Sequence, residues 1–495
     1  MLKTIKLNIQ RMYNKIINRW EIICFVMGIL AYLAYVFYAY EEVPFESYIN
    51  KFYLLDLLYS GKLTFKSLLS TYNENGMLAA NCLFLVNVKL FHFSVLVESL
   101  VNAFLVVVVA RFVMFNYFDT LDVRKSNLLY CLVIAISSLF LFSCMQQGGG
   151  GMSLQVRFGL TSFIVTTYMI DRVLQDETTL LYYVLTLVMI VLSINFFGTA
   201  YSFAGIPFIF IIIFSEIIRY RKINLKQIGI CLTYIICYCA YFIEYGFAAK
   251  DIVSNNYNSN GLVSMIVGMF VKWKDLLMSL LYWCGSCVLG RATLEDGHIA
   301  YQMYLFIGAL VLIFLVIAII LYIKLKLYQV TYLPAFWVGY FIVLFAMLFM
   351  GRADTLDAVW MTSSWYTVHT KFIPVIVLGI FLYAGKEIKK DRLTRKVMSW
   401  VVCAFFGLTI LFGTYCTVVR LPFEKAWIKG KQAYFFVENK DELPVDESGS
   451  TPLFQDRDTS WEAIQLLKKY HLSLFRNYDA YEIMQQIRLQ DQEEK

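Results

Sequence analysis

The sequence predicts an all-α polytopic integral membrane protein. Hydrophobic residues make up 59% of the chain, only 16% of the residues are charged, and the mean hydropathy is +0.62. Soluble chains carry roughly 25% charged residues. The apolar residues form continuous runs close to the ~20 residues that a helix needs to cross a bilayer. They do not alternate as barrel strands would, and backbone groups in lipid must bond within their own segment, so we expect helices.

About eleven membrane-spanning helices are predicted along the chain. Each is a mainly apolar run bounded by charged or turn-forming residues. Their ranges are 21–40, 95–117, 127–145, 153–171, 178–196, 200–218, 227–245, 301–323, 330–350, 370–385 and 398–419.

Positive charge alternates between the loops and predicts the orientation. Lys and Arg residues are concentrated at the N-terminus and in short loops such as 219–226 and 386–396. Short loops rich in Lys and Arg stay in the cytoplasm. The net charge of +7 therefore indicates membrane topology rather than nucleic-acid binding. We expect the N-terminus inside and the C-terminus outside, in a multi-pass membrane protein.

This topology divides the chain into three parts. Residues 1–20 would form a basic cytoplasmic N-terminus, and residues 21–419 a transmembrane domain. The long loops 41–94, 246–300 and 351–369 would face outward, with interfacial helices in the larger ones. A hydrophilic tail, 420–495, would lie outside and carry an amphipathic helix that begins with a Ser/Thr-x-x-Glu-like start at Thr459.

Two features of the outer loops leave alternatives open. The stretch from Met77 to Leu90 could span the membrane, but the cations Arg124 and Lys125 would then fall outside, so an interfacial helix is preferred. Cys284 and Cys287 form a lone C-x-x-C without a second pair or a nearby His, which does not favour a metal site. No cofactor is expected; a divalent cation stays open, although no motif indicates one.

Carboxylates directly beyond the first helix are the candidate catalytic residues. Glu41, Glu42, Glu46 and Asp56 stand among aromatic residues in the first outer loop. A carboxylate at the membrane surface can act as a general base. The alternative is a solvated acidic rim.

Cationic residues near the outer helix ends are the candidate ligands for an anionic substrate. Arg352 ends an apolar run, and His369 and Lys371 return at the start of the next one. A guanidinium can bind phosphate with two parallel hydrogen bonds. The alternative is that Arg352 and Lys371 only extend toward the interface. The Gly-Arg-Ala of residues 351–353 recurs at 290–292, which adds Arg291 as a candidate, although the recurrence is read as coincidence.

Arg157 lies about one turn inside a predicted membrane helix. A charge at such a depth is costly and indicates either a site or an internal partner. Glu98, near the outer end of the second predicted helix, is the candidate partner. An ion pair and a substrate contact both stay open.

Sugar transfer from a lipid-linked donor is the outer-face reaction that needs carboxylates and arginines without a nucleotide-binding loop. The donor would be a polyprenyl phosphate or diphosphate, held by cations at the interface. A carboxylate would deprotonate the hydroxyl of a glycan acceptor, and stabilisation of the leaving phosphate would be electrostatic. The expected partners are therefore the lipid bilayer, a polyprenyl-linked sugar or oligosaccharide and a glycan acceptor.

Four segments resemble a family of bacterial polytopic envelope proteins. They are "GKLTFKSLLSTYNENGML" (61–78), "FSCMQQGGGGMSLQ" (142–155), "GR…SSWYT" (351–367) and "AIQLLKKYHLSLF" (463–475). This family looks like membrane glycosyltransferases of the GT-C type, which act in envelope polysaccharide or teichoic acid assembly. The resemblance implies an acidic base in the first outer loop, at Glu41, Glu42 or Glu46.

The same resemblance places Glu74 in a motif that reads His/Asn-Glu-His-Arg in the family. This chain departs from the family at two points: Asn75-Gly76 stand where His-Arg is expected, and Trp365 stands where Arg is expected. Both changes remove groups that could bind phosphate.

Two other functions remain as alternatives. A polymerase or ligase that moves whole lipid-linked repeat units, of the Wzy or O-antigen-ligase type, would have similar outer-face residues. A transporter or flippase would instead place polar residues and broken helices at the membrane midplane. The sequence does not fix the sugar, the linkage, the acceptor or the oligomeric state.

Overall fold

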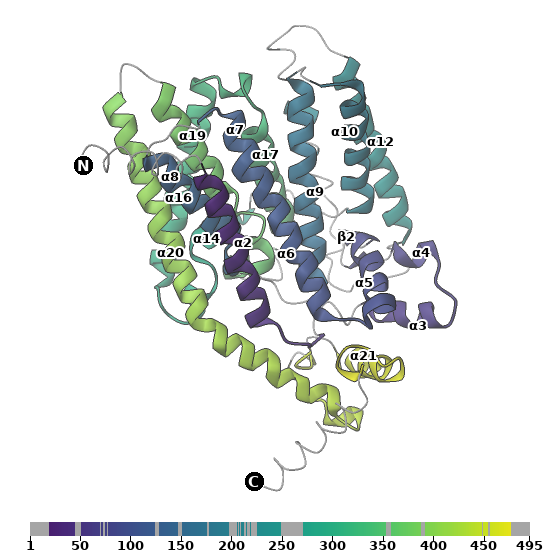
Figure 1. The fold of residues 1–495 in the computed structure, drawn as a ribbon. Coiled ribbons are helices and arrows are strands. Elements are labelled where there is room, and N and C mark those ends of the chain that lie inside the picture. Colours follow the sequence, from purple (N-terminus) through teal and green to yellow (C-terminus); the bar gives the residue numbers. More distant parts are fainter. Residues whose placement is uncertain are drawn as a thin grey trace, which may run out of the picture.

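The structure is a computed structural model of an all-helical bundle, with a small layer of short elements at one end (Figure 1). It describes residues 19–44, 51–69, 71–72, 75–76, 78–123, 128–146, 151–175, 178–197, 205, 207, 209–211, 214, 218, 225–248, 271–352, 358–387, 392–447, 449–453 and 456–476. Strand structure within this part is limited to β1 (Thr71–Tyr72) paired antiparallel with β2 (Asn75–Gly76).

Most long helices follow the predicted apolar runs, but residues 273–289, in the predicted outer loop 246–300, form a helix that packs within the bundle. Ten of the eleven predicted ranges contain a described helix, and the range 200–218 lies largely outside the described residues. The bundle consists of α2 (Trp20–Ala39), α6 (Val95–Arg111) with the π-helical η2 (Phe112–Tyr117), α8 (Leu128–Leu141), α9 (Gly151–Leu174), α10 (Leu180–Val191) with η4 (Leu192–Phe196), α12 (Leu225–Ala248), α14 (Trp273–Leu289), α16 (Tyr301–Lys324), α17 (Leu333–Arg352), α19 (Ile373–Glu387) and α20 (Arg392–Gly430).

The surface of the bundle is apolar. Four described helices are long and apolar enough to cross a membrane: Trp20–Ala39, Val95–Thr120, Tyr301–Lys324 and the segment Val397–Phe436. Only 17% of the apolar window of α2 is buried, and Met27, Leu30 and Phe37 on this helix are exposed. A surface helix of a soluble protein turns a polar face to solvent, so this outer surface is that of a protein embedded in lipid.

Helix α9 lies inside the bundle and is tied to its neighbours by polar side chains. Thr161 donates to the carbonyl of Leu105 on α6 (3.5 Å), and Ser162 shares a 3.1 Å hydrogen bond with Ser193 of η4. The indole of Trp337 on α17 donates to Thr167 (3.0 Å). Such hydrogen bonds between helices add to packing where lipid removes the hydrophobic drive for association.

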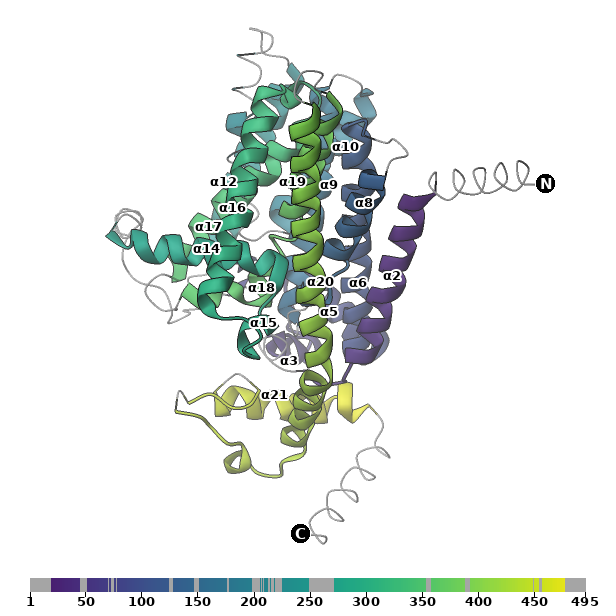
Figure 2. The same ribbon diagram turned by 90° about the vertical axis from the view of Figure 1, so that its left-hand side faces the viewer.

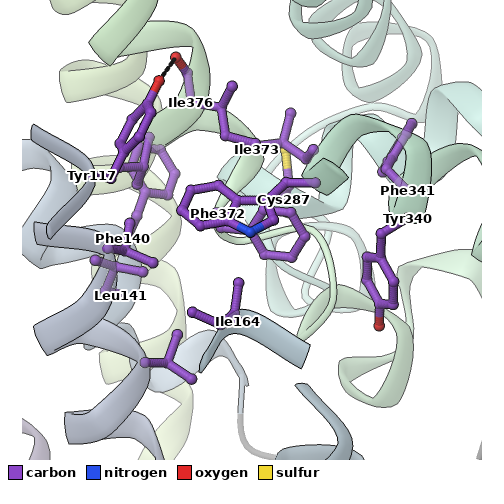
Figure 3. Close-up of a cluster of buried hydrophobic side chains, with 14 of the residues drawn as sticks. Tyr117, Phe140, Leu141, Ile164, Cys287, Tyr340, Phe341, Phe372, Ile373 and Ile376 are labelled. Atoms are coloured by element: carbon purple, nitrogen blue, oxygen red, sulfur yellow. Dashed lines mark hydrogen bonds between the residues drawn. The ribbon is translucent and has the colours of Figure 1, made fainter. Parts of the chain in front are cut away.

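The apolar core is closed by the turn that leads into α19. Figure 3 shows Phe372 between Tyr117 of η2 and Tyr340 of α17, with Ile164 of α9 on one side. The hydroxyl of Tyr117 donates to the carbonyl of Ile376 (3.1 Å), so this buried group is satisfied within the core.

Helix α20 is longer than a bilayer is thick. At about 1.5 Å per residue its 39 residues exceed the ~30 Å hydrocarbon core. The helix therefore continues through the predicted boundary at 419–420, and Figure 2 shows it running the length of the bundle toward α21 (Arg457–Lys469). The amphipathic tail helix is confirmed, but the predicted start at Thr459 is wrong. Asp456 is the N-cap, because its carboxylate accepts from the backbone N–H of Thr459 (2.9 Å).

The short elements at this end form a second core, which we call the end layer. It combines the first loop with the C-terminal segment, since Phe52, Leu55 and Phe84 pack in one buried cluster with Phe436 and Leu467. The first loop contributes α3 (Tyr53–Tyr59) and α5 (Leu78–Phe91), and the C-terminal segment contributes η9 (Lys431–Phe436), α21 and η11 (Ser473–Phe475). The described short helices α4 (Phe65–Leu68) and η10 (Lys440–Glu442) have no residue in this core. Figure 1 shows α3 and α21 beside each other below the bundle.

A break in the first loop follows helix α3. Helix α3 ends at Tyr59, Ser60 caps it, and Gly61 has the positive φ of +71° that favours glycine. Helix α5, which covers the stretch Met77–Leu90 from its second residue onward, has 14 residues. It is shorter than the ~20 residues of a spanning helix.

Candidate functional site

The predicted site residues separate into distinct regions. Glu46 and Glu74 lie outside the described residues, and Arg352 is the last residue of α17, with only its backbone described. The others fall into two surface positions, a pair of carboxylates at the end of α2, and a buried cationic cluster.

Asp56 and Arg291 lie at the surface. The Asp56 side chain is 58% exposed, 3.9 Å from the ammonium of Lys469 and 3.4 Å from the hydroxyl of Tyr470. Arg291 forms an ion pair with Glu295 in α15 (Ala292–Glu295), and Glu295 also binds Arg420 of α20 (2.6 Å). Both residues form ion pairs at exposed positions, and such pairs contribute little to the free energy of unfolding.

Glu41 and Glu42 follow the C-terminal end of α2 and are largely covered. The Glu41 side chain is 16% exposed and lies 3.8 Å from the ammonium of Lys425 on α20. That ammonium also donates to the carbonyl of Tyr38 (2.9 Å). The ion pair thus joins the end of α2 to the part of α20 that projects from the bundle.

The side chain of Glu42 contacts the first turn of α6. Its Oε1 accepts from the backbone N–H of Val95 (2.9 Å), and its Oε2 accepts from the hydroxyls of Ser94 (3.4 Å) and Tyr40. A carboxylate is favoured at a helix N-terminus because the free N–H groups and the helix dipole both stabilise it. The C-terminal segment adds the hydroxyl of Ser473 (3.3 Å) and the guanidinium of Arg476 (3.5 Å).

Arg157, His369 and Lys371 form a buried cationic cluster. Arg157 lies on α9, and the other two lie in the turn before α19; each is at most 6% exposed. The charge of Arg157 acts on both partners. Together with burial, which is the larger cause, it lowers the pKa of His369 to about 3.

Lys371 and His369 each form a hydrogen bond with a neutral group. The ammonium of Lys371 donates to the carbonyl of Cys287 on α14 (3.1 Å), and Nδ1 of His369 shares a 2.7 Å hydrogen bond with the hydroxyl of Tyr340. The ionisable groups that act on Lys371 within the described residues are Cys287, Cys144 and Arg157, with no carboxylate among them. The ammonium of Lys371 is therefore suited to bind an anion.

The predicted pair of Glu98 with Arg157 stays a prediction. Glu98 is 1% exposed, accepts from the amide of Asn87 (3.4 Å), and its charge acts on Lys51, which is 2% exposed. Lys51, Tyr340, Ser473 and Arg476 did not emerge from the sequence as site residues. Their types are common, and no local pattern marks a contact with a distant segment. Within the described residues no group of three His, Cys, Asp or Glu side chains could hold a metal ion.

The fold and this site define an α-helical membrane protein with a buried cationic cluster near one end of the bundle. Comparison with protein-family models, with curated proteins and with solved structures finds no match for this chain.

Proposed function

We propose that this protein is an envelope glycosyltransferase of the bacterial plasma membrane that uses a polyprenyl-phosphate-linked sugar on its extracytoplasmic face. In this proposal the chain crosses the membrane about eleven times, with the N-terminus in the cytoplasm. The end layer then faces outward, at the level of the lipid headgroups. The resemblance of the four sequence segments to GT-C-type glycosyltransferases is a further reason for this proposal.

The observation that carries the proposal is the cluster of Arg157 with Lys371. Lys371 is a buried cation whose ammonium donates to the carbonyl of Cys287, and a bound anion would lower its energy. In this proposal a lipid phosphate reaches Lys371 while its polyprenyl chain stays in the bilayer. Arg157 would bind the phosphate oxygens, and Lys371 would neutralise the charge that develops on the leaving phosphate.

Glu42 and Glu41 are the described candidates for the general base. Glu42 lies next to solvent at the end of α2, with its side chain 12% exposed. A base must reach the proton it removes within hydrogen-bonding distance, and the acceptor glycan would approach from the end layer. Glu46 and Asp56 stay candidates from the sequence.

The burial of Arg157 and Lys371 inside the bundle also favours a second function, a flippase or transporter for an anionic lipid or sugar. Intramembrane charges line substrate pathways in transporters. A polymerase or ligase of lipid-linked repeat units would use the same residues as the transferase.

The test is the structure of the envelope glycan and of its lipid-linked precursors in a deletion strain. The strain is complemented with wild type, Arg157→Gln, Lys371→Gln or Glu42→Gln, and with Lys324→Gln as the control at an exposed helix end. Membrane levels of each variant are measured in parallel. A glycan that lacks one sugar in the three site variants supports the transferase.

Other outcomes separate the alternatives. Complete single repeats that accumulate on lipid indicate a polymerase or ligase. Precursors that accumulate only on the inner leaflet indicate a flippase. Unchanged glycan and precursors in all three site variants, at normal protein levels, would rule out the proposed transferase.

A further inference from the structure

Glu42 is held by two segments that are far apart in the sequence. Val95, Ser94 and Tyr40 provide donors from the end of α2 and the start of α6. Ser473 and Arg476 provide donors from the C-terminal segment, on Oε1 and Oε2 respectively. Oε1 is thus contacted by Val95 and by Ser473 of the tail, and Oε2 by Ser94, Tyr40 and the tail residue Arg476.

The C-terminal donors are themselves fixed. The backbone N–H of Ser473 donates to the carbonyl of His92 (2.9 Å), which lies just before α6. The Nε of Arg476 donates to the carbonyl of Ser473 (3.2 Å), and this hydrogen bond orients the guanidinium. Leu472 and Phe475 are buried in the end layer, which anchors the segment on its other side.

Backbone strain is concentrated at this contact. Six non-glycine residues in the described part of the chain have positive φ angles. Four of them flank the contact: His92 (50°) and Phe93 (54°) before α6, and His471 (52°) and Ser473 (52°) in the tail. Such conformations cost energy and persist where surrounding contacts enforce them, often at functional sites.

We propose that Ser473 and Arg476 are positioning residues that hold the Glu42 carboxylate on the first turn of α6. The C-terminal segment is then a required part of the site to which Glu42 belongs, although 431 residues separate Glu42 from Ser473. This inference rests on the proposed function, in which Glu42 is a candidate base. It assigns to the tail a role in the site rather than only in packing.

The test is a double-mutant cycle on the full-length protein in lipid nanodiscs. The variants are Glu42→Gln, Arg476→Ala and the combination of the two, with Arg476→Lys as the conservative change. Arg457→Ala is the matched control, because it removes a tail cation whose partner, Asp441, also belongs to the tail (3.6 Å). Hydrogen exchange of the peptide that contains Val95 reports on the contact, and glycan output in the complemented strain reports on function.

We expect Arg476→Ala to speed exchange at Val95 by about threefold, as for the loss of one partly exposed ion pair. Arg476→Lys should recover most of the protection, and Arg457→Ala should leave it unchanged. Residues that act through each other give non-additive effects, so the double variant should lose no more glycan output than Glu42→Gln alone.

Two results would overturn the inference in different ways. Additive effects of Glu42→Gln and Arg476→Ala on exchange would show that the two residues act independently. Coupled exchange with wild-type glycan output from Glu42→Gln would show that the contact only joins the tail to the bundle, and that the base of the proposed function lies elsewhere. A thermal melting midpoint for each variant identifies any loss that comes from unfolding.

Discussion

The hydroxyl of Tyr340 on α17 lies 2.7 Å from Nδ1 of His369 in the turn before α19. This contact places a buried imidazole beside Arg157, and burial together with that positive charge keeps the ring neutral. Protonation of His369 would create a further cation in a cluster that already holds Arg157 and Lys371. The stability of the folded protein at acid pH therefore depends on whether His369 is protonated.

We predict that His369 makes the protein sensitive to acid. Its pKa is about 3 in the folded protein and 6.5 ordinarily, so between these values the unfolded chain binds a proton that the folded protein excludes. Stability is therefore lost as the pH falls below 6.5, by about 2 kcal/mol at pH 5. Thermal melting in detergent should show a smaller drop from pH 7.5 to 5 for His369→Gln than for wild type. His298→Gln, at an exposed position, is the control, and an equal drop in all three proteins would contradict the prediction.

Lys371 should contribute to the binding of an anionic lipid through its positive charge. Its ammonium is buried and donates to the carbonyl of Cys287 (3.1 Å). Lys371→Gln should weaken the binding of a fluorescent polyprenyl phosphate in nanodiscs by about tenfold, as for the loss of one hydrogen bond to a charged group. Lys371→Arg keeps the charge and should bind more tightly than Lys371→Gln. Lys324→Gln, at an exposed helix end, is the control, and equal affinities of wild type and Lys371→Gln would show that Lys371 does not contact the phosphate.

Asp171 should be a stability determinant at the opposite end of α9. Its carboxylate accepts from the backbone N–H of Tyr332 (2.6 Å) and from the hydroxyl of Thr331 (3.0 Å), just before α17 begins. Asp171→Ala would leave these buried donors without an acceptor, at a cost of about 3 kcal/mol. Asp171→Asn retains one acceptor oxygen and should cost less. Melting midpoints in detergent measure both, with exposed Asp275→Ala as the control; equal midpoints for Asp171→Ala and the control would refute this role.

The contact of α14 with α16 should not tolerate a side chain at residue 308. A Cβ at Gly308 would lie 2.0 Å from the carbonyl oxygen of Leu281 and 3.1 Å from the backbone nitrogen of Gly285. Backbone atoms cannot rotate away, so Gly308→Ala should destabilise the protein by about 2 kcal/mol or more. Gly430→Ala meets nothing within 4 Å and is the matched control. Similar melting midpoints for the two variants would mean that the helices separate at little cost.

Local hydrophobicity determined the fold class and most helix positions. The runs that became α2, α6, α9 and α16 are visible in the sequence because each is apolar over most of its length. The start of α21 was misplaced because Asp456 and Thr459 can both cap a helix. Only the geometry shows that Asp456 accepts the hydrogen bond.

The candidate site was predictable only as a set of residue types. Arg157 stood out because a charge within an apolar run is rare. That Arg157 lies near His369 and Lys371 could not be predicted, since it depends on how α9 packs beside the turn before α19. Likewise, the contact of Glu42 with Arg476 needs the end layer, in which the first loop and the tail share one apolar core.

The sequence by itself determined that this is an α-helical membrane protein, because hydropathy acts over the length of one helix. The tertiary structure alone decided which charges meet, which are buried and which remain at the surface. The physical reason is that these outcomes depend on packing between segments hundreds of residues apart, whereas helix formation in lipid depends on each segment alone.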